Sequence, residues 1–223
     1  MLLTFILNLT AAQAAFRMTL LSSVGSKKLA GQDPSTAADG VLISNGNFNY
    51  GLKFSVGLSA SWHILAGYEA SSYAFDNTEN ILEGDTGISA NSTEIGMRWI
   101  LFSRTALRFL FNLEDSIGFK VNAASRAVLY KENLKYLSLY YDQIVYLGST
   151  IFGGFKVGYD LPTSGSEITD RQGSKYGIFV TVNTSGWGQF ETYFELKNIT
   201  KYDDQLEYIE KDSNLNISYT VGF

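Results

Sequence analysis

The sequence predicts an all-β chain that folds as one transmembrane antiparallel up-and-down β-barrel of ten strands, within a range of eight to twelve. Three observations lead to this prediction: apolar residues recur at every second position, short and long connections alternate, and aromatic residues lie near the connections. Of the 223 residues only 17% are charged, while 14% are aromatic. Soluble domains usually contain roughly 25% charged residues, so the composition suits a chain with an apolar exterior.

The N-terminus has the pattern of a secretory leader. Residues 1–9 (MLLTFILNL) are mostly apolar, and Ala12-Gln13-Ala14 fits the small-x-small site of signal peptidase. We expect residues 1–14 to be a signal peptide and 15–223 to be a single barrel domain. No Lys or Arg precedes the apolar run, so the alternative is a buried strand or helix within residues 1–20.

Alternation with period 2 defines the strands in chain order. In the stretch 46–58, Phe48, Leu52 and Val56 share one face, while Asn49 and Lys53 share the other. The same alternation recurs at 62–71, 92–101, 107–114, 151–160, 176–182, 190–197 and 215–223. A first strand at about 15–24 and a less regular one at 134–147 complete the ten.

The connections between these strands alternate strictly in length. Short connections lie near 59–61, 102–104, 148–150 and 183–188, and long ones near 25–45, 76–90, 115–133, 161–174 and 200–213. A soluble sandwich gives no reason for this asymmetry, whereas outer-membrane barrels have short periplasmic turns and long extracellular loops. An even number of strands then places both termini in the periplasm.

Aromatic residues are expected to form two outward-facing girdles, which suit the two membrane–water interfaces. The predicted girdle residues are Trp62, Trp99 and Trp187 beside the short turns, and Tyr50, Tyr73, Tyr159 and Tyr176 toward the long loops.

With these features the chain resembles bacterial outer-membrane β-barrel proteins as a superfamily, without matching one family in it. The last strand carries an assembly-signal pattern that comprises Leu215, Ile217, Tyr219, Val221 and Phe223. The resemblance implies a bacterial outer-membrane location, contact with outer-membrane lipid and lipopolysaccharide, and recognition by the barrel-assembly machinery. Ten strands also occur in omptin proteases and some adhesins, but the omptin catalytic pattern is absent.

The inward face of the predicted strands carries six basic and six acidic residues. They are Lys53, Glu69, Glu94, Arg98, Arg108, Glu114, Lys156, Asp160, Lys175, Glu191, Glu195 and Lys197. Charges in a narrow lumen are costly unless they are paired, so we expect an ion-pair network in which Glu94 and Arg98 partner Arg108 and Glu114. Ten strands give a narrow lumen, and long inward residues are expected to plug it: Arg98, Arg108, Phe152, Phe179 and Tyr193.

Several chemistries find no support in the sequence. There is no Cys, and His63 is the only histidine, beside a short turn, so we expect no catalytic residues, metal or cofactor. Two acidic stretches, 76–85 and 203–212, could hold divalent cations, but solvated loops are the simpler interpretation. A net charge of −5 without a Lys/Arg run argues against nucleic acid as a partner.

These observations predict a small non-enzymatic barrel with a largely plugged lumen. It would act structurally, or in interaction and adhesion through its long extracellular loops, with lipid, another cell or an envelope protein as partner. The alternatives are a narrow porin-like channel for small solutes or ions and, third, an outer-membrane enzyme that uses carboxylates of the loops.

Overall fold

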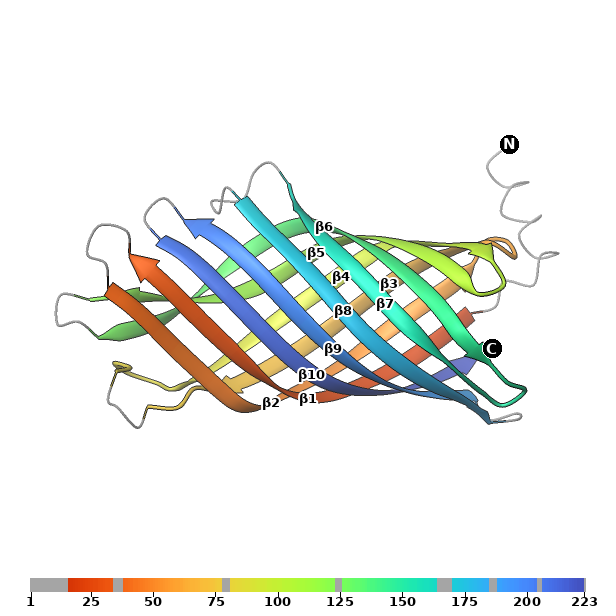
Figure 1. The fold of residues 1–223 in the computed structure, drawn as a ribbon, viewed down its shortest axis with the longest axis horizontal. Coiled ribbons are helices and arrows are strands. Elements are labelled where there is room, and N and C mark those ends of the chain that lie inside the picture. The colour runs from red at the N-terminus through yellow and green to blue at the C-terminus, as the bar shows by residue number, and fades with distance from the viewer. Residues whose placement is uncertain are drawn as a thin grey trace.

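The computed structural model is a closed antiparallel barrel in which consecutive strands pair and β1 also pairs with β10 (Figure 1). The structure describes residues 16–33, 38–77, 81–122, 126–163, 170–184, 188–203 and 206–222. The strands are β1 (Phe16–Asp33), β2 (Ala38–Gly57), β3 (Trp62–Ala74), β4 (Gly87–Phe102), β5 (Thr105–Val121), β6 (Ala127–Leu147), β7 (Ile151–Pro162), β8 (Asp170–Thr184), β9 (Gly188–Asp203) and β10 (Leu206–Gly222). The described residues include no helix that is long and apolar enough to cross a membrane.

The barrel has two different ends. The short-turn end holds the connections β2–β3, β4–β5, β6–β7 and β8–β9, together with the start of β1 and the end of β10, and lies at the right in Figure 1. The hairpin end, at the left, holds the other five connections. The predicted number of ten strands is confirmed, and the four short connections lie where the sequence places them.

The predicted long loops are wrong for much of their length, because the strands continue through them. β6, for example, has 21 residues and includes 127–133, whereas a strand needs about 9–11 residues to cross a bilayer. Beyond the bilayer neither face of a strand meets lipid, so the sequence loses the strict alternation although the ladder persists. The barrel therefore extends well beyond the thickness of a membrane at its hairpin end.

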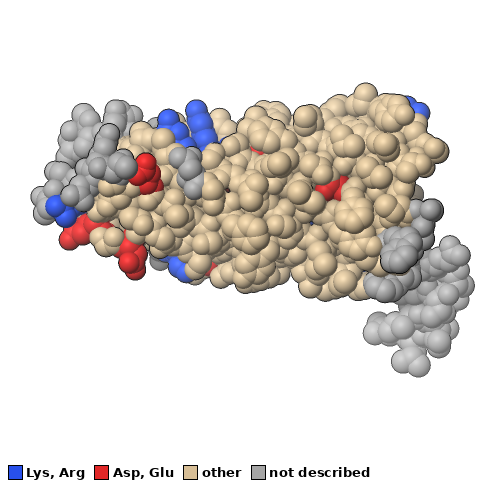
Figure 2. All heavy atoms as spheres, turned by 90° about the horizontal axis from the view of Figure 1, so that it is seen from below, with Lys and Arg blue, Asp and Glu red and all other residues tan. Residues whose placement is uncertain are grey.

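The outer wall near the short-turn end is apolar. Large apolar side chains point outward there and are strongly exposed, with Ile178 at 66%, Ile95 at 57% and Ile217 at 55%. Farther along the strands the outward positions become polar, at Asp115 and Lys135 for example. Figure 2 shows the same division, because charged side chains gather at the hairpin end and the middle is almost free of them. Such an apolar band is the surface that a barrel turns to lipid.

The aromatic residues lie partly as predicted. Trp62 and Trp99 are cross-strand partners on the outside of the short-turn end, and their rings stack with centroids 5.2 Å apart. The side chains of Tyr50, Tyr159 and Tyr176 are exposed on the outer wall, at 58%, 44% and 54%.

The expected outward position of Tyr73 is wrong. Its ring lies inside the barrel beneath Lys27 Nζ, 4.8 Å from the ring centroid. Tyr73 is an odd number of positions from the outward Trp62, so the pleat of β3 turns it to the lumen.

The last strand completes the closure of the barrel. Leu215 and Val221 of β10 pair with Val24 and Met18 of β1, on the outward face of both strands. Three predictions fall outside the described residues: the signal peptide at 1–14, the girdle residue Trp187 and the final Phe223.

Candidate functional site

The lumen contains most of the charged side chains that could act as a site, because inward side chains of all ten strands meet there. Its polar residues form three layers of ion pairs between the short-turn end and the hairpin end, and an apolar cluster follows the third layer. Each layer is placed by the register of the barrel, which sets which inward residues face one another.

The first layer lies nearest the short-turn end. Arg108 on β5 donates two hydrogen bonds of 2.8 Å to the carboxylate of Asp142 on β6, through Nε and Nη2. Two further ion pairs of this layer each skip one strand: Lys53 with Glu94 at 2.9 Å, and Lys156 with Glu191 at 2.5 Å. Charge-assisted and bidentate bonds of this kind are the strong ones, so the layer is well fixed.

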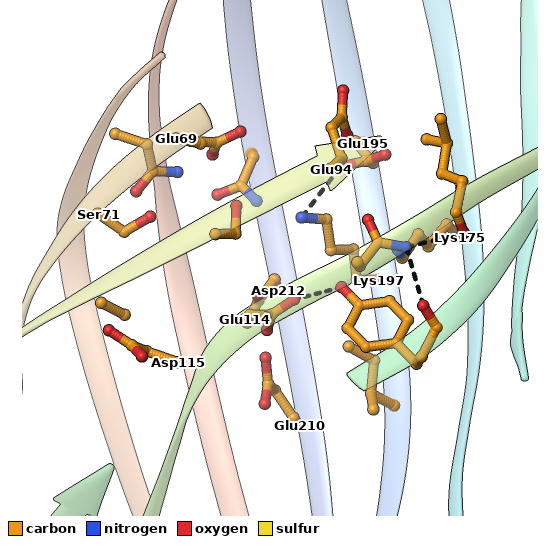
Figure 3. Close-up of a pocket in the computed structure, with 18 of the residues that line it drawn as sticks. Glu69, Ser71, Glu94, Glu114, Asp115, Lys175, Glu195, Lys197, Glu210 and Asp212 are labelled. Carbon is orange, nitrogen blue, oxygen red and sulfur yellow. Dashed lines mark hydrogen bonds and ion pairs between the residues drawn. The ribbon is translucent and has the colours of Figure 1, made fainter. Parts of the chain in front are cut away.

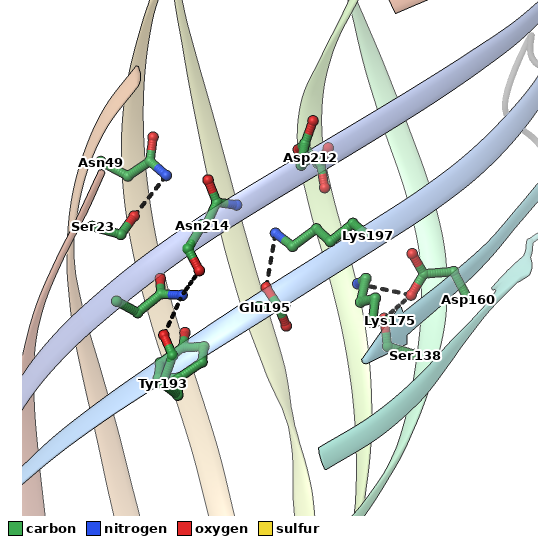
Figure 4. Close-up of polar contacts among 12 residues, drawn as sticks. Ser23, Asn49, Ser138, Asp160, Lys175, Tyr193, Glu195, Lys197, Asp212 and Asn214 are labelled. Atoms are coloured by element: carbon green, nitrogen blue, oxygen red, sulfur yellow. Dashed lines mark hydrogen bonds and ion pairs between the residues drawn. The ribbon is translucent and has the colours of Figure 1, made fainter. Parts of the chain in front are cut away.

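The second layer lies in the middle of the barrel (Figure 4). Lys175 Nζ is 2.9 Å from Asp160 Oδ1, and Ser138 Oγ donates to the same oxygen at 2.6 Å. Lys197 pairs with Glu195 on its own strand at 3.4 Å. Asp160 is fully buried, so its pairing is what makes the burial of this charge tolerable.

The third layer connects opposite walls. Glu210 on β10 accepts hydrogen bonds from Lys27 on β1 and from Lys201 on β9, and Asp212 lies 3.3 Å from the same Lys27. Lys201 also donates to Ser116 Oγ on β5, which is not a neighbour of β9 in the barrel. Side chains therefore meet across the lumen at this level, and all five residues are at most 7% exposed.

An apolar cluster, here named the cap, lies at the hairpin end. Its buried members are Leu29, Leu42, Phe75, Leu82, Ala90, Ile117, Phe119 and Ala127. They come from β1, β2, β4, β5 and β6 and from the connection between β3 and β4.

Backbone hydrogen bonds hold that connection in place. Asp76 N donates to Ile43 O of β2, and Ala127 N of β6 donates to Ile81 O. Because β2 and β6 are four strands apart, the connection ties distant parts of the wall together over the lumen.

Two cavities lie between these side chains. The first, of about 100 Å³, lies among the charged residues of the middle layers; Figure 3 shows Glu69, Glu94, Glu195 and Lys197 around it. The second, here named the chamber, has about 400 Å³ and lies at the short-turn end. Both cavities lie on the short-turn side of the cap.

The expected partners within the network are wrong in detail. Glu94 pairs with Lys53 and Arg108 with Asp142, whereas Glu114 accepts a hydrogen bond from the Tyr136 hydroxyl. The reason is register: β4 and β5 place Arg98 directly opposite Arg108, so the two cations are neighbours and cannot pair.

Five charged residues of the layers were not predicted from the sequence. They are Lys27, Asp142, Lys201, Glu210 and Asp212. Four of them were expected in long loops and Asp142 in a strand with irregular alternation, so none was assigned an inward position. Glu210 and Asp212 point inward to lysines, which leaves no cation site at these two residues of the acidic stretch 203–212.

The residues considered for catalysis do not come together. His63 faces the chamber, in register with Arg98 on β4. In the part of the chain that the structure describes, no three His, Cys, Asp or Glu side chains are grouped to hold a metal ion.

Comparison with known proteins gives the class of fold. No protein-family model and no curated protein sequence matches the chain. The outer-membrane protease OmpT from Escherichia coli matches in structure with a TM-score of 0.50 over 95% of this chain and 97% of its own, at 8% identity. An outer-membrane channel from Pseudomonas putida F1 matches with a TM-score of 0.50 over 94% and 96%, at 11% identity.

The chain has the fold of a bacterial outer-membrane β-barrel. The apolar band of its wall agrees with this class, since barrels of the outer membrane turn such a band to lipid. Identities of 8% and 11% show the fold alone, and one of the two matched barrels is a protease while the other is a channel. The function of this barrel therefore has to be argued from its own lumen and ends.

Proposed function

We propose that this protein is a non-enzymatic barrel of the bacterial outer membrane that does not conduct and acts through its hairpin end. The observation that supports the proposal is the contact of side chains across the lumen in the third layer, with the buried cap beyond it toward the hairpin end. Lys201 and Ser116 meet there from strands that are not neighbours, and a path for solutes would have to break the contacts of Lys201 with Ser116 and Glu210.

The hairpin end has the features of an interaction surface. It extends beyond the apolar band, it carries the charged side chains visible in Figure 2, and the buried cap lies within it. We propose that the short-turn end and both termini face the periplasm. The hairpin end would then meet lipopolysaccharide, another cell or an envelope protein, and the barrel-assembly machinery would insert the chain.

A narrow channel is the second candidate, and the chamber is the observation that favours it. The chamber of about 400 Å³ is a wide vestibule at one end of the lumen. Conduction would require the cap to move away, because Leu29, Leu42 and Phe119 are each 2% exposed in the present arrangement.

Single-channel recording separates the two candidates. The refolded protein is inserted into planar bilayers, and heat-modifiable migration on a gel verifies that the barrel is folded. The closed-barrel proposal expects a silent bilayer. Stable, reproducible conductance steps from folded protein would reject it and support the channel.

A further inference from the structure

We propose that the chamber is a binding site for a small amphipathic carboxylate. The chamber lies at the short-turn end and is formed by inward residues of many strands. With about 400 Å³ it falls within the range of roughly 300–1,000 Å³ that is usual for small-molecule pockets. Neither the closed lumen nor the proposed role of the hairpin end calls for a cavity at this place.

The charges of the chamber are unbalanced. Its carboxylates, Glu94, Asp142 and Glu191, are each held by a cation of the first layer. Arg17, Arg98 and Arg104 also line it, and within the described ranges none of these three has a carboxylate within 4.0 Å. The chamber therefore has an excess of guanidinium groups over available anions.

Among these three arginines, Arg98 gives the strongest indication of a bound anion. Its Nε is shielded from solvent and has no hydrogen-bond partner. In the register, Arg98 lies between His63 on β3 and Arg108 on β5, so neither adjacent strand offers it an anion. A buried donor without a partner is unfavourable, and a ligand anion that accepts its hydrogen bond would supply the missing acceptor.

Apolar side chains also line the chamber. Phe152, Phe179 and Ile144 come from β7, β8 and β6, and Leu65 and Ile100 come from β3 and β4. A fully ionic ligand such as phosphate would leave these apolar side chains without a partner. A carboxylate with a short apolar or aromatic body fits both parts, because the head meets the arginines and the body lies against the phenylalanines.

The test uses phenylacetate as the probe and phenylacetamide as its neutral isostere. Binding is measured by isothermal titration to the full barrel in lipid nanodiscs, with folding verified by heat-modifiable migration. We expect phenylacetate to bind with a Kd of about 1 mM or tighter and the amide to bind at least about tenfold more weakly.

Variants locate the site. Arg98→Gln is expected to weaken phenylacetate binding about tenfold or more, Arg17→Gln to weaken it several-fold, and Phe152→Ala to weaken both probes. Lys131→Gln, which removes an exposed cation near the hairpin end, is the matched control and should leave the Kd within about twofold.

Three results would overturn the proposal. They are no binding of phenylacetate to the folded barrel at about 10 mM, equal affinity for the amide, and unchanged affinity in folded Arg98→Gln protein. If Arg98→Gln does not fold, Arg17→Gln decides in its place. Conductance would contradict the proposed function, whereas failure of these binding tests would contradict this inference. The two results are therefore distinguishable.

Discussion

The bidentate ion pair between Arg108 and Asp142 is the contact for which the structure predicts the effect of a substitution most clearly. The two side chains are 19% and 11% exposed, and two hydrogen bonds of 2.8 Å join them. Asp142→Leu removes the carboxylate and leaves the guanidinium facing Arg98 and the apolar leucine. Breaking a buried pair costs roughly 3–5 kcal/mol, and we expect about 3 kcal/mol because the chamber admits some water.

The free energy of unfolding is measured by urea titration in phospholipid vesicles, with tryptophan fluorescence as the signal. The double variant Arg108→Met/Asp142→Leu removes both charges and should recover most of the loss, because no unpaired charge remains. Lys131→Gln serves as the surface control, with an expected change within about 0.5 kcal/mol. An Asp142→Leu variant as stable as the parent, or a double variant less stable than the single one, would contradict this role of the pair.

Four further substitutions, one of them a control, test other parts of the barrel in the same titration. Gly96→Ala should lose about 3 kcal/mol or fail to fold, since its Cβ would lie 1.9 Å from the Phe109 carbonyl oxygen, whereas Gly87→Ala has no atom nearer than 3.9 Å and should be neutral; equal stabilities would contradict this. Glu210→Gln leaves the two lysines of the third layer without their shared anion and should cost about 3 kcal/mol, so a neutral result would show that water compensates them. Phe119→Ala, at a cap residue that is 2% exposed, should cost roughly 3–5 kcal/mol, and a loss below about 1 kcal/mol would show that the cap is loosely packed.

The class of fold could be predicted because lipid imposes a strict rule on the sequence. A strand with lipid on one face must alternate, and the apolar outward residues of β2, β5, β8 and β9 carry that signal. The rule ends where the lipid ends. The outer halves of β5 and β6 therefore looked like loops, although their ladder continues to Val121 and Ala127.

The sequence predicts that inward charged residues form ion pairs, but it does not predict which residues pair with which. Alternation identifies Arg98, Arg108 and Glu94 as inward, but it does not give the register between strands. The register places Arg98 beside Arg108 and brings Asp142 to the latter. Pairs that skip a strand, such as Lys53 with Glu94, also depend on the curvature of the closed wall, which one sequence does not show.

We propose a barrel that is open at the short-turn end and closed beyond it, and single cysteines test this directly because the chain has no Cys. Ser55 lines the chamber, whereas Ser23 is 2% exposed and its Oγ accepts a hydrogen bond from Asn49 Nδ2 farther along the lumen. Ser55→Cys and Ser23→Cys proteins in vesicles are treated with a membrane-impermeant maleimide added to each side in turn. We expect Cys at position 55 to be labelled rapidly from the short-turn side only, and Cys at position 23 not to be labelled from either side. Equal labelling at both positions, or labelling of position 55 from the hairpin side, would contradict it.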